Sequence, residues 1–207
     1  MQGRFISMEG GEGAGKSTMM SHMAGWLESK GHRVIRTREP GGTVLAEKIR
    51  TILLDDEHLT LCSQAELLLM FASRAQHLDE LIRPALARGE TVLCDRFTDA
   101  TWAYQGGGRQ LPANLIASLE QMVHGDLQPD LTLLLDLPVE VGLERASRRG
   151  AADRFEQESV LFFERVRQAY LDRAEVHANR FAVIDAALEP EQVWSQIQSV
   201  LERRLGL

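Results

Sequence analysis

Short apolar runs alternate with longer amphipathic stretches along the whole chain. The apolar runs predict strands within residues 5–8, 33–37, 91–94, 131–135 and 181–184. Apolar residues at helical spacing predict helices over 16–30, 44–54, 63–87, 139–149, 156–179 and 190–205, and one more that begins at Pro112. Strands that alternate with helices are joined by right-handed crossovers and form a parallel sheet with helices on both faces. The pattern therefore predicts an α/β fold of three layers around a five-stranded parallel sheet.

Glycine and proline mark the breaks between these elements. Gly31 ends the first predicted helix, and residues 39–43, with the sequence EPGGT, are typical of a loop. The three consecutive glycines Gly106, Gly107 and Gly108 predict a flexible loop tip. The sequence contains no internal repeat, linker or low-complexity tract, so residues 1–207 are expected to form one domain.

Composition and charge narrow the class of protein. Hydrophobic residues make up 44% and charged residues 26% of the chain, which is typical of a globular domain. The net charge of −7 argues against sequence-independent binding to nucleic acid, which requires Lys and Arg to neutralise phosphates. No apolar stretch approaches the roughly 20 residues needed to cross a bilayer, and the N-terminus lacks the apolar core of a signal peptide. We therefore expect a cytoplasmic protein that contacts neither membrane nor nucleic acid.

The two cysteines, Cys62 and Cys94, lie in apolar surroundings and form no CxxC pattern. We expect both to be small core residues, and we expect no disulfide between them.

Residues 10–17, with the sequence GGEGAGKS, match the phosphate-binding pattern G-x-x-x-x-G-K-[ST]. A predicted strand precedes the motif and a predicted helix begins inside it, as this motif requires. Glycines let consecutive backbone N–H groups face phosphates, Lys16 can reach the outer phosphates, and the Ser17 hydroxyl can ligate Mg²⁺. The sequence therefore predicts a nucleoside triphosphate site formed by Gly10, Gly11, Glu12, Gly13, Ala14, Gly15, Lys16, Ser17 and Thr18.

The lysines exclude one large class of P-loop protein. A switch GTPase should carry an Asn-Lys-x-Asp motif that reads guanine, but none of Lys16, Lys30 and Lys48 follows an asparagine. The motif alone still leaves kinases and other ATPases open.

A second group of phosphate-binding residues follows two of the predicted strands. Arg38 lies at the end of the second strand, and Asp95 and Arg96 lie at the end of the third. Because the carboxyl ends of parallel strands line one crevice, both arginines should approach the P-loop. They indicate a second phosphorylated ligand, although each arginine by itself could also be a solvated loop residue.

Four segments together resemble the thymidylate kinase family, whose members phosphorylate dTMP to dTDP with ATP. The segments are residues 9–17 (EGGEGAGKS), 37–43 (TREPGGT), 71–74 (FASR) and 95–97 (DRF), in the family's order and at its intervals. Including the arginine-rich segment, the motifs span residues 9–156, and the strand–helix pattern continues to the end of the chain. The resemblance implies a P-loop kinase fold with a lid, ATP and Mg²⁺ as donor and cofactor, and a homodimer.

The resemblance also assigns residues to the acceptor dTMP. It implies that Arg38 holds the dTMP phosphate, that Arg96 lies between the reacting phosphates, and that Glu12 contacts the sugar 3′-OH. Tyr104 is expected to crowd the 2′ position. Thr101 and Gln105 are expected to contact the base edge.

On the same resemblance, Arg74 hydrogen-bonds a base oxygen and Phe71 stacks on thymine. An aromatic face and a guanidinium fork suit a flat base with carbonyl oxygens. For Phe71, however, the apolar run 67–71 by itself favours core packing.

An arginine-rich segment near residues 145–156 predicts a mobile lid. Arg145, Arg148, Arg149 and Arg154 surround a Gly-Ala-Ala break, and their mutual repulsion favours closure on an anion such as ATP. An exposed helix end is the alternative. The P-loop carries Glu12 and no arginine, which resembles the bacterial class that takes its catalytic arginine from the lid. Arg149 is the first choice for that role, and Arg145 and Arg154 are the alternatives.

Two acids at strand ends compete for the Mg²⁺ site, Asp95 and Asp136, and the resemblance favours Asp95, acting through water. The function expected is transfer of the γ-phosphoryl group of Mg-ATP to dTMP, with Lys16, Asp95, Arg96 and Arg149 as catalytic residues. Another nucleotide or deoxynucleoside kinase is the first alternative, and a regulatory P-loop ATPase is the second.

Overall fold

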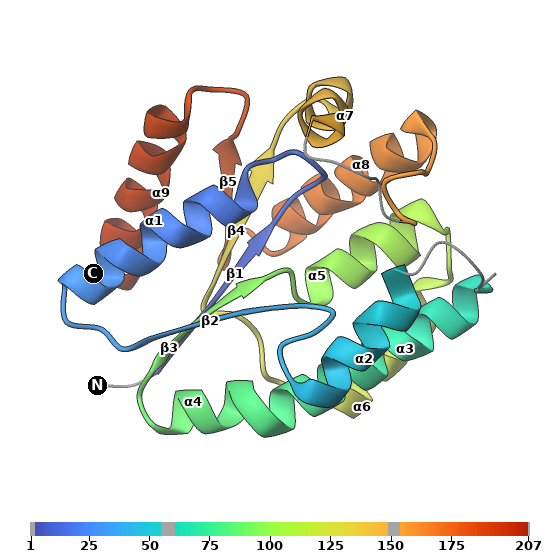
Figure 1. The fold of residues 1–207 in the computed structure, drawn as a ribbon, viewed down its shortest axis with the longest axis horizontal. Coiled ribbons are helices and arrows are strands. Elements are labelled where there is room, and N and C mark those ends of the chain that lie inside the picture. The colour runs from blue at the N-terminus through green and yellow to red at the C-terminus, as the bar shows by residue number, and fades with distance from the viewer. Residues whose placement is uncertain (1–2, 55–60, 149–153, 207) are drawn as a thin grey trace.

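Five parallel strands form one sheet in the computed structural model, which describes residues 3–54, 61–148 and 154–206 (Figure 1). The strand order is β2-β3-β1-β4-β5, and every neighbouring pair is parallel. The strands are β1 (Arg4–Glu9), β2 (Val34–Arg38), β3 (Thr91–Asp95), β4 (Leu131–Asp136) and β5 (Phe181–Asp185). The predicted five-stranded parallel sheet is confirmed.

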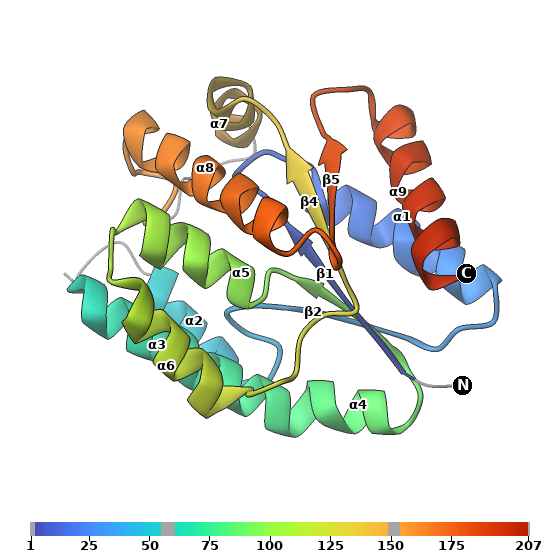
Figure 2. The same cartoon turned by 180° about the vertical axis from the view of Figure 1, so that it is seen from behind.

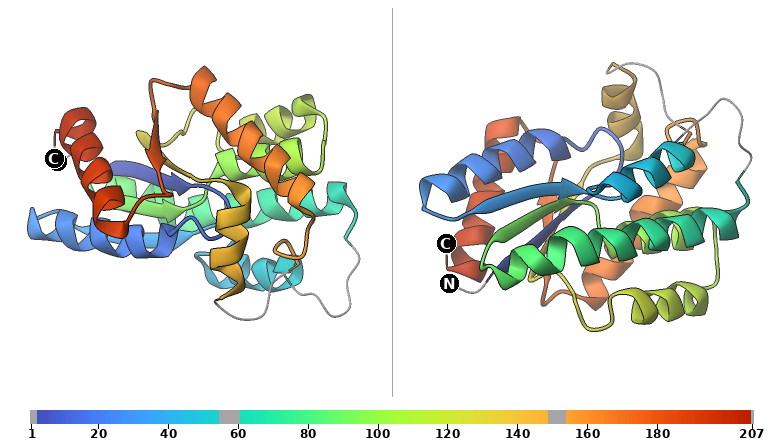
Figure 3. Two further views of the ribbon diagram at one scale, coloured as in Figure 1. Left: turned by 90° about the horizontal axis from the view of Figure 1, so that it is seen from above. Right: turned by 60° about the horizontal axis from the view of Figure 1, so that its bottom comes forward.

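Helices cover both faces of the sheet, as Figures 2 and 3 show from behind and from above. One face carries α1 (Lys16–Ser29) and α9 (Pro190–Leu205). The remaining elements are α2 (Val44–Leu54), α3 (Ser63–His77), the π-helical turn η1 (Leu78–Ile82), α4 (Arg83–Ala87), α5 (Thr98–Thr101), the π-helical η2 (Trp102–Gly108), α6 (Ala113–Val123), α7 (Val139–Ser147) and α8 (Val160–Val176). The helix predicted over 63–87 is thus the continuous run α3-η1-α4, while α8 is shorter than the predicted 156–179.

Alternation along β1 places the core on both faces. Ile6 and Met8 are fully buried on the side of α1 and α9, and Phe5 is buried on the opposite side with Ile82 and Phe97. Successive strand side chains point to opposite faces, so a strand of apolar residues is buried on both sides. The sheet therefore fixes the position of the loop that follows β1.

Gly106, Gly107 and Gly108 do not form the predicted flexible loop tip, because they end the helical element η2. The prediction was wrong for a tertiary reason: η2 packs closely on α8. A Cβ atom added to Gly107 would lie 2.6 Å from Ala169 Cβ and 2.9 Å from the carbonyl oxygen of Arg165. The glycines are needed where two helix backbones approach each other.

The prediction for the cysteines is half correct. Cys94 is buried in β3, but Cys62 is exposed immediately before α3, so it is not a core residue. An apolar neighbour such as Leu61 does not bury a residue at the solvent side of a helix start. Both cysteines are free, as expected.

The last residue of β1, Glu9, joins three elements through a buried carboxyl group. Its Oε1 accepts a hydrogen bond from the Phe97 backbone N–H at 2.7 Å, and its Oε2 accepts one from the Tyr170 hydroxyl at 2.8 Å. Burial, together with the negative charge of Asp99, raises the pKa of Glu9 to about 8. Glu9 therefore fixes the loop after β3 and helix α8 against the start of the P-loop.

Gly107→Ala is expected to lower the free energy of unfolding by about 1–3 kcal/mol, because its methyl group overlaps α8. Gly25→Ala is the control: Gly25 is an exposed residue of α1 with open space at its Cβ position. That substitution should increase stability by up to about 1 kcal/mol through helix propensity. Urea denaturation followed by circular dichroism measures both. Equal stabilities of the two variants would contradict the close packing of η2 on α8.

Glu9→Gln is expected to flatten the pH dependence of stability between about pH 5 and pH 8. With a folded pKa of about 8 and an ordinary value of 4.5, the native state retains a proton that the unfolded chain releases in this window. The stability contributed by neutral Glu9 is therefore complete below pH 4.5 and is lost as pH rises towards 8. Glutamine stays neutral and removes this loss. The measurement is the free energy of unfolding at several pH values, and Glu80→Gln, at an exposed position, is the control. If Glu9→Gln leaves the slope of stability against pH unchanged, the retained proton belongs to another group.

Candidate active site

The P-loop between β1 and α1 is held in a conformation that glycines permit. Gly10, Gly13 and Gly15 have positive φ angles of 138°, 68° and 84°. A Cβ atom on Gly13 would lie 2.0 Å from the carbonyl oxygen of Gly142 in α7. The loop therefore packs directly on α7 and presents its backbone at the start of α1.

The side chain of Lys16 folds back over the P-loop. Its Nζ donates hydrogen bonds to the carbonyl oxygens of Gly10 at 3.1 Å and Gly11 at 2.8 Å. Burial lowers the pKa of Lys16 and the nearby Arg96 lowers it further, against the opposing charges of Glu12 and Asp95. The ammonium group is thus buried beside the phosphate-binding loop, where it can attract an anion.

Arg96 and Glu12 form the ion pair at the centre of the site. Arg96 Nη2 donates to Glu12 Oε1 at 2.6 Å and to the Tyr104 hydroxyl oxygen at 2.7 Å, and the Tyr104 hydroxyl donates to the same Glu12 oxygen at 2.8 Å. Burial by itself would raise the pKa of Glu12, but Arg96 and Lys16 lower it to about 2. Arg96 has a φ of 67°, a strained conformation for a residue with a side chain and one that is common at functional sites.

A cavity with about 560 Å³ of empty space, part of it open to solvent, lies beside this ion pair, between α3 and η2. Six residues that the resemblance assigned to dTMP line it: Glu12, Arg74, Arg96, Thr101, Tyr104 and Gln105. Sequence reasoning missed several further lining residues: Glu39, Pro40, Arg50, Leu54, Met70, Phe97, Ala100 and Phe155. Most of these are apolar and look like core in a sequence; only the fold turns them towards a cavity.

Arg74 is buried, with 2% of its surface exposed, and its contacts leave one nitrogen for a ligand. Its Nε donates to Glu39 Oε2 at 2.7 Å, and its Nη2 donates to Thr101 Oγ1 at 3.0 Å. Its Nη1 has no hydrogen-bond partner among the described residues. A buried donor without a partner is costly, so this nitrogen is suited to a ligand oxygen in the cavity.

Phe71 does not line the cavity, which corrects its expected stacking on thymine. It is buried with Leu67 and Ile116, and the Arg74 guanidinium lies 4.8 Å from its ring centroid. Met70, one residue earlier, lines the cavity instead. The core packing favoured by the run 67–71 is therefore correct, and Phe71 supports Arg74 from behind.

Arg38 lies outside this cavity, in a wider cleft of about 950 Å³ that also contains Ser17 and Asp95. The expected approach of Arg38, the P-loop and Asp95 is confirmed. The Arg38 side chain is 53% exposed and pairs with Glu47 at 2.9 Å. A ligand phosphate in the cleft would have to compete with this exposed carboxylate.

The geometry distinguishes the two acids considered for Mg²⁺. Asp95 Oδ1 is buried and lacks a partner in the part of the chain that the structure describes. Asp136 is engaged instead in two hydrogen bonds from Arg167, at 2.7 and 2.9 Å. Within residues 3–54, 61–148 and 154–206 no three His, Cys, Asp or Glu side chains form a metal cluster. Mg²⁺ that keeps its waters and binds phosphates needs no such cluster.

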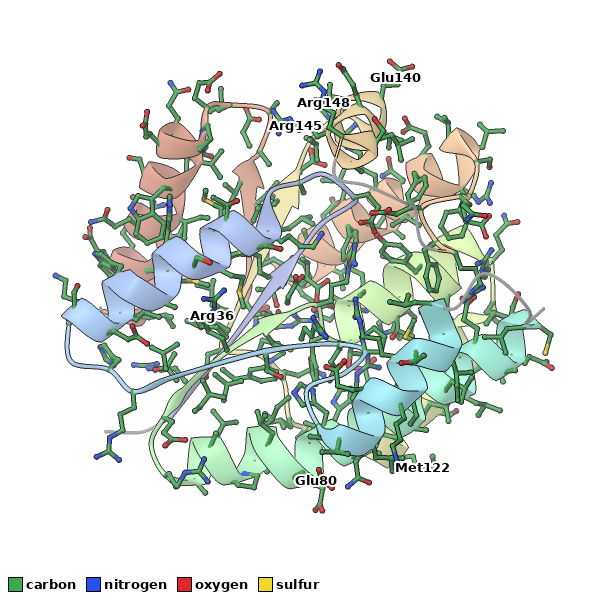
Figure 4. The ribbon with its side chains drawn as sticks, in the orientation of Figure 1. Arg36, Glu80, Met122, Glu140, Arg145 and Arg148 are labelled. Atoms are coloured by element: carbon green, nitrogen blue, oxygen red, sulfur yellow. The ribbon has the colours of Figure 1, made fainter. Side chains whose placement is uncertain are left out.

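The arginines of the predicted lid separate in space. Arg145 of α7 donates to the carbonyl oxygen of Ala186 after β5 at 2.8 Å. Arg148, directly after α7, pairs with Glu144, and Figure 4 shows both arginines beside this helix. Arg154 donates instead to Glu66 Oε2 at 2.7 Å, on the side of the cavity, so the structure does not bring it to the P-loop as expected. Arg149, the first choice for catalysis, lies outside the described residues.

Comparison with known proteins shows the family of this chain. The model of the thymidylate kinase family matches residues 8–197. A thymidylate kinase of Pseudomonas putida strain F1 is 59% identical over 201 residues, covering 97% of this chain and 96% of the relative. That of Pseudomonas syringae pv. tomato is 56% identical over 207 residues, covering 100% and 99%.

The crystal structure of thymidylate kinase from Ehrlichia chaffeensis superposes with a TM-score of 0.78 at 33% identity, covering 97% of this chain and 99% of that one. Family, relatives and fold agree over nearly the full length. The chain therefore belongs to the thymidylate kinase family, the kinases that phosphorylate dTMP with ATP.

Proposed function

We propose that the P-loop holds ATP and that the 560 Å³ cavity holds dTMP while the γ-phosphoryl group passes between them, giving dTDP and ADP. The observation that carries this proposal is the position of Arg96. Its guanidinium donates to the carbonyl oxygen of Gly10 in the P-loop at 3.3 Å and also lines the cavity. A single charged group thus faces both sites, where donor and acceptor phosphates would meet.

In this proposal, Arg74 and Gln105 hold the base edge with Thr101, while Tyr104 and Glu12 face the sugar. Arg38 at the end of β2 and Arg96 after β3, both on the same side of the P-loop strand, are assigned to the dTMP phosphate. The fully paired side of Arg74 is directed to protein atoms, so its Nη1 is available for a base oxygen. Tyr104, held against Glu12 and buried, restricts space beside the sugar.

The transfer needs charge neutralisation and positioning rather than a general base, because a phosphate oxygen of dTMP is already a nucleophile. Lys16 and Arg96 supply positive charge on the donor side, and Glu12 holds the pKa of Arg96 well above its usual range, against the effect of burial. Arg149 is the proposed source of a further catalytic arginine, and Arg145 contributes on the ATP side. Residues 1–207 act as one domain.

We propose Mg²⁺ as cofactor, held by Ser17 and, through water, by Asp95. The buried Asp95 Oδ1 without a partner among the described residues, in one cleft with Ser17, supports this assignment. Bound Mg²⁺ would neutralise negative charge on the transferring phosphates.

We also propose a homodimer formed through helices α2, α3 and α6, which lie side by side (Figure 1). These helices expose large apolar side chains: Leu45, Ile52, Leu68, Leu115 and Met122. Exposed apolar side chains gathered on adjacent helices are typical of an interface.

A cytoplasmic location, where ATP is abundant, is proposed as well. No helix within the described residues is long and apolar enough to cross a membrane.

Arg74→Ala is expected to lower kcat/KM for dTMP by roughly 5- to 150-fold, the effect of about 1–3 kcal/mol for a buried hydrogen bond, and to leave the KM for ATP nearly unchanged. The difference in kcat/KM between dTMP and dCMP should become smaller. A coupled ADP-release assay with dTMP, dUMP, dCMP and UMP measures this; the wild type should use dTMP best and dCMP and UMP poorly. Arg83→Ala, an exposed arginine of the same helical run, is the control. Undiminished use of dTMP by Arg74→Ala would place the base elsewhere.

Leu68→Glu is expected to convert the dimer to a monomer, because it places a charge within the proposed apolar interface. The Leu68 side chain on α3 is 57% exposed in the single chain. Leu188→Glu is the matched control, since Leu188 is 41% exposed but follows β5, away from α3. Size-exclusion chromatography with light scattering reads out the mass. A dimer that persists in Leu68→Glu would assign the interface to another face.

A further inference from the structure

The carboxylate of Glu66, on α3, is buried behind the cavity with 1% of its surface exposed. It receives hydrogen bonds from Gln105, which lines the cavity, and from two arginines, Arg109 and Arg154. Glu66 itself does not line the cavity. Its influence on a ligand must therefore pass through Gln105.

The contacts of Glu66 determine which way the Gln105 amide points. Gln105 Nε2 donates to Glu66 Oε1 at 2.9 Å. A carboxylate oxygen can accept hydrogen bonds but cannot donate them, so the amide nitrogen must be the atom that faces Glu66. Arg109 Nη2 at 3.2 Å and Arg154 Nη2 at 2.7 Å hold the other oxygen, Oε2, and prevent the carboxylate from turning.

With its nitrogen turned to Glu66, Gln105 directs its amide oxygen, an acceptor, to the opposite side, where it can face a ligand in the cavity. Thymine carries an N–H donor at ring position 3, whereas cytosine carries a lone pair there. An acceptor facing this position attracts the first base and repels the second. We propose that Glu66 is a positioning residue that determines pyrimidine specificity by fixing the orientation of the Gln105 amide. This inference rests on the proposed placement of dTMP in the cavity.

Glu66→Gln tests the orientation directly, because glutamine has one oxygen and one NH₂ group. Arg154 Nη2 at 2.7 Å and Arg109 Nη2 at 3.2 Å both donate to Oε2, whereas Oε1 receives, within the described residues, only Arg109 Nε at 3.2 Å besides Gln105. The stronger set of donors favours an oxygen at the Oε2 position, which turns the new NH₂ group towards Gln105. Gln105 must then reverse and present its own NH₂ group to the cavity. The ratio of kcat/KM for dTMP over dCMP is expected to fall by about tenfold or more, with the KM for ATP unchanged.

Glu158→Gln is the matched control. Glu158 pairs with Nη1, on the opposite side of Arg109, whereas the Gln105 amide donates to Glu66. Its dTMP to dCMP ratio should stay within about twofold of the wild type. Equal losses for dTMP and dCMP in Glu66→Gln, or the same change of ratio in both variants, would overturn the proposal.

A measurement on the wild-type enzyme keeps the proposal testable if Glu66→Gln does not fold. The N3-methyl analogue of dTMP lacks the N–H donor at position 3 and keeps both carbonyl oxygens. If Gln105 presents its oxygen, this analogue should be a substrate at least about tenfold poorer than dTMP; equal use would refute the orientation.

Failure of this proposal and failure of the cavity assignment are distinguishable. Arg74→Ala reports on whether the base occupies the cavity, whereas Glu66→Gln and the analogue report on the direction of the amide. If Arg74→Ala uses dTMP poorly and Glu66→Gln keeps the wild-type ratio of kcat/KM for dTMP over dCMP, the base occupies the cavity but Glu66 does not determine specificity.

Discussion

The ion pair between Arg96 and Glu12 is the interaction on which the rest of the site depends. Glu12 belongs to the P-loop and Arg96 follows β3, so their 2.6 Å contact joins the two adjacent strand ends that border the crevice. Arg96 adopts a strained backbone with φ 67°, which surrounding contacts must stabilise. Glu9 provides one of them by accepting the N–H of the next residue, Phe97, at 2.7 Å. The strain is thus balanced by a buried hydrogen bond from the same strand that carries the P-loop.

The charges around this ion pair explain how buried cations are tolerated before a phosphate binds. Lys16 and Arg96 lie close enough for Arg96 to lower the pKa of Lys16. Glu12 offsets both cations, and its own pKa of about 2 keeps it ionised. Glu9, in contrast, is neutral below a pKa of about 8 because burial and Asp99 oppose its charge. A phosphate entering the site would therefore meet two cations, Lys16 and Arg96, whose charges are balanced by the carboxylates of Glu12 and Asp95.

The side chains that line the cavity are oriented by buried carboxylates. Glu39 accepts a hydrogen bond from Arg74 at 2.7 Å, and its other oxygen lies 3.0 Å from His77 Nδ1. Arg74 is thereby held with one nitrogen unpaired among the described residues, and Phe71 packs against its guanidinium. Glu66 restrains Gln105 in a comparable way. In both cases a buried carboxylate fixes the hydrogen-bonding direction of the side chain in front of it.

The sequence by itself determined the layered fold and the position of the P-loop. Apolar periodicity is a local property, and α2 (Val44–Leu54) and α9 (Pro190–Leu205) begin and end where it predicts. Arg96 was also identifiable from the rule that strand ends converge, and Glu12 and Arg74 were identifiable from the resemblance of their motifs to the thymidylate kinase family.

Only the tertiary structure decided what depends on contacts between distant segments. The sequence of Gly106–Gly108 predicts a loop, but these glycines pack against α8. Helix α3 turns Phe71 to the core and the preceding residue, Met70, to the cavity. Arg154 lies with Glu66, 88 residues away in sequence, rather than with the P-loop. Periodicity specifies which face of an element is apolar, but it carries no information about which distant side chain that face, or a charge beside it, will meet.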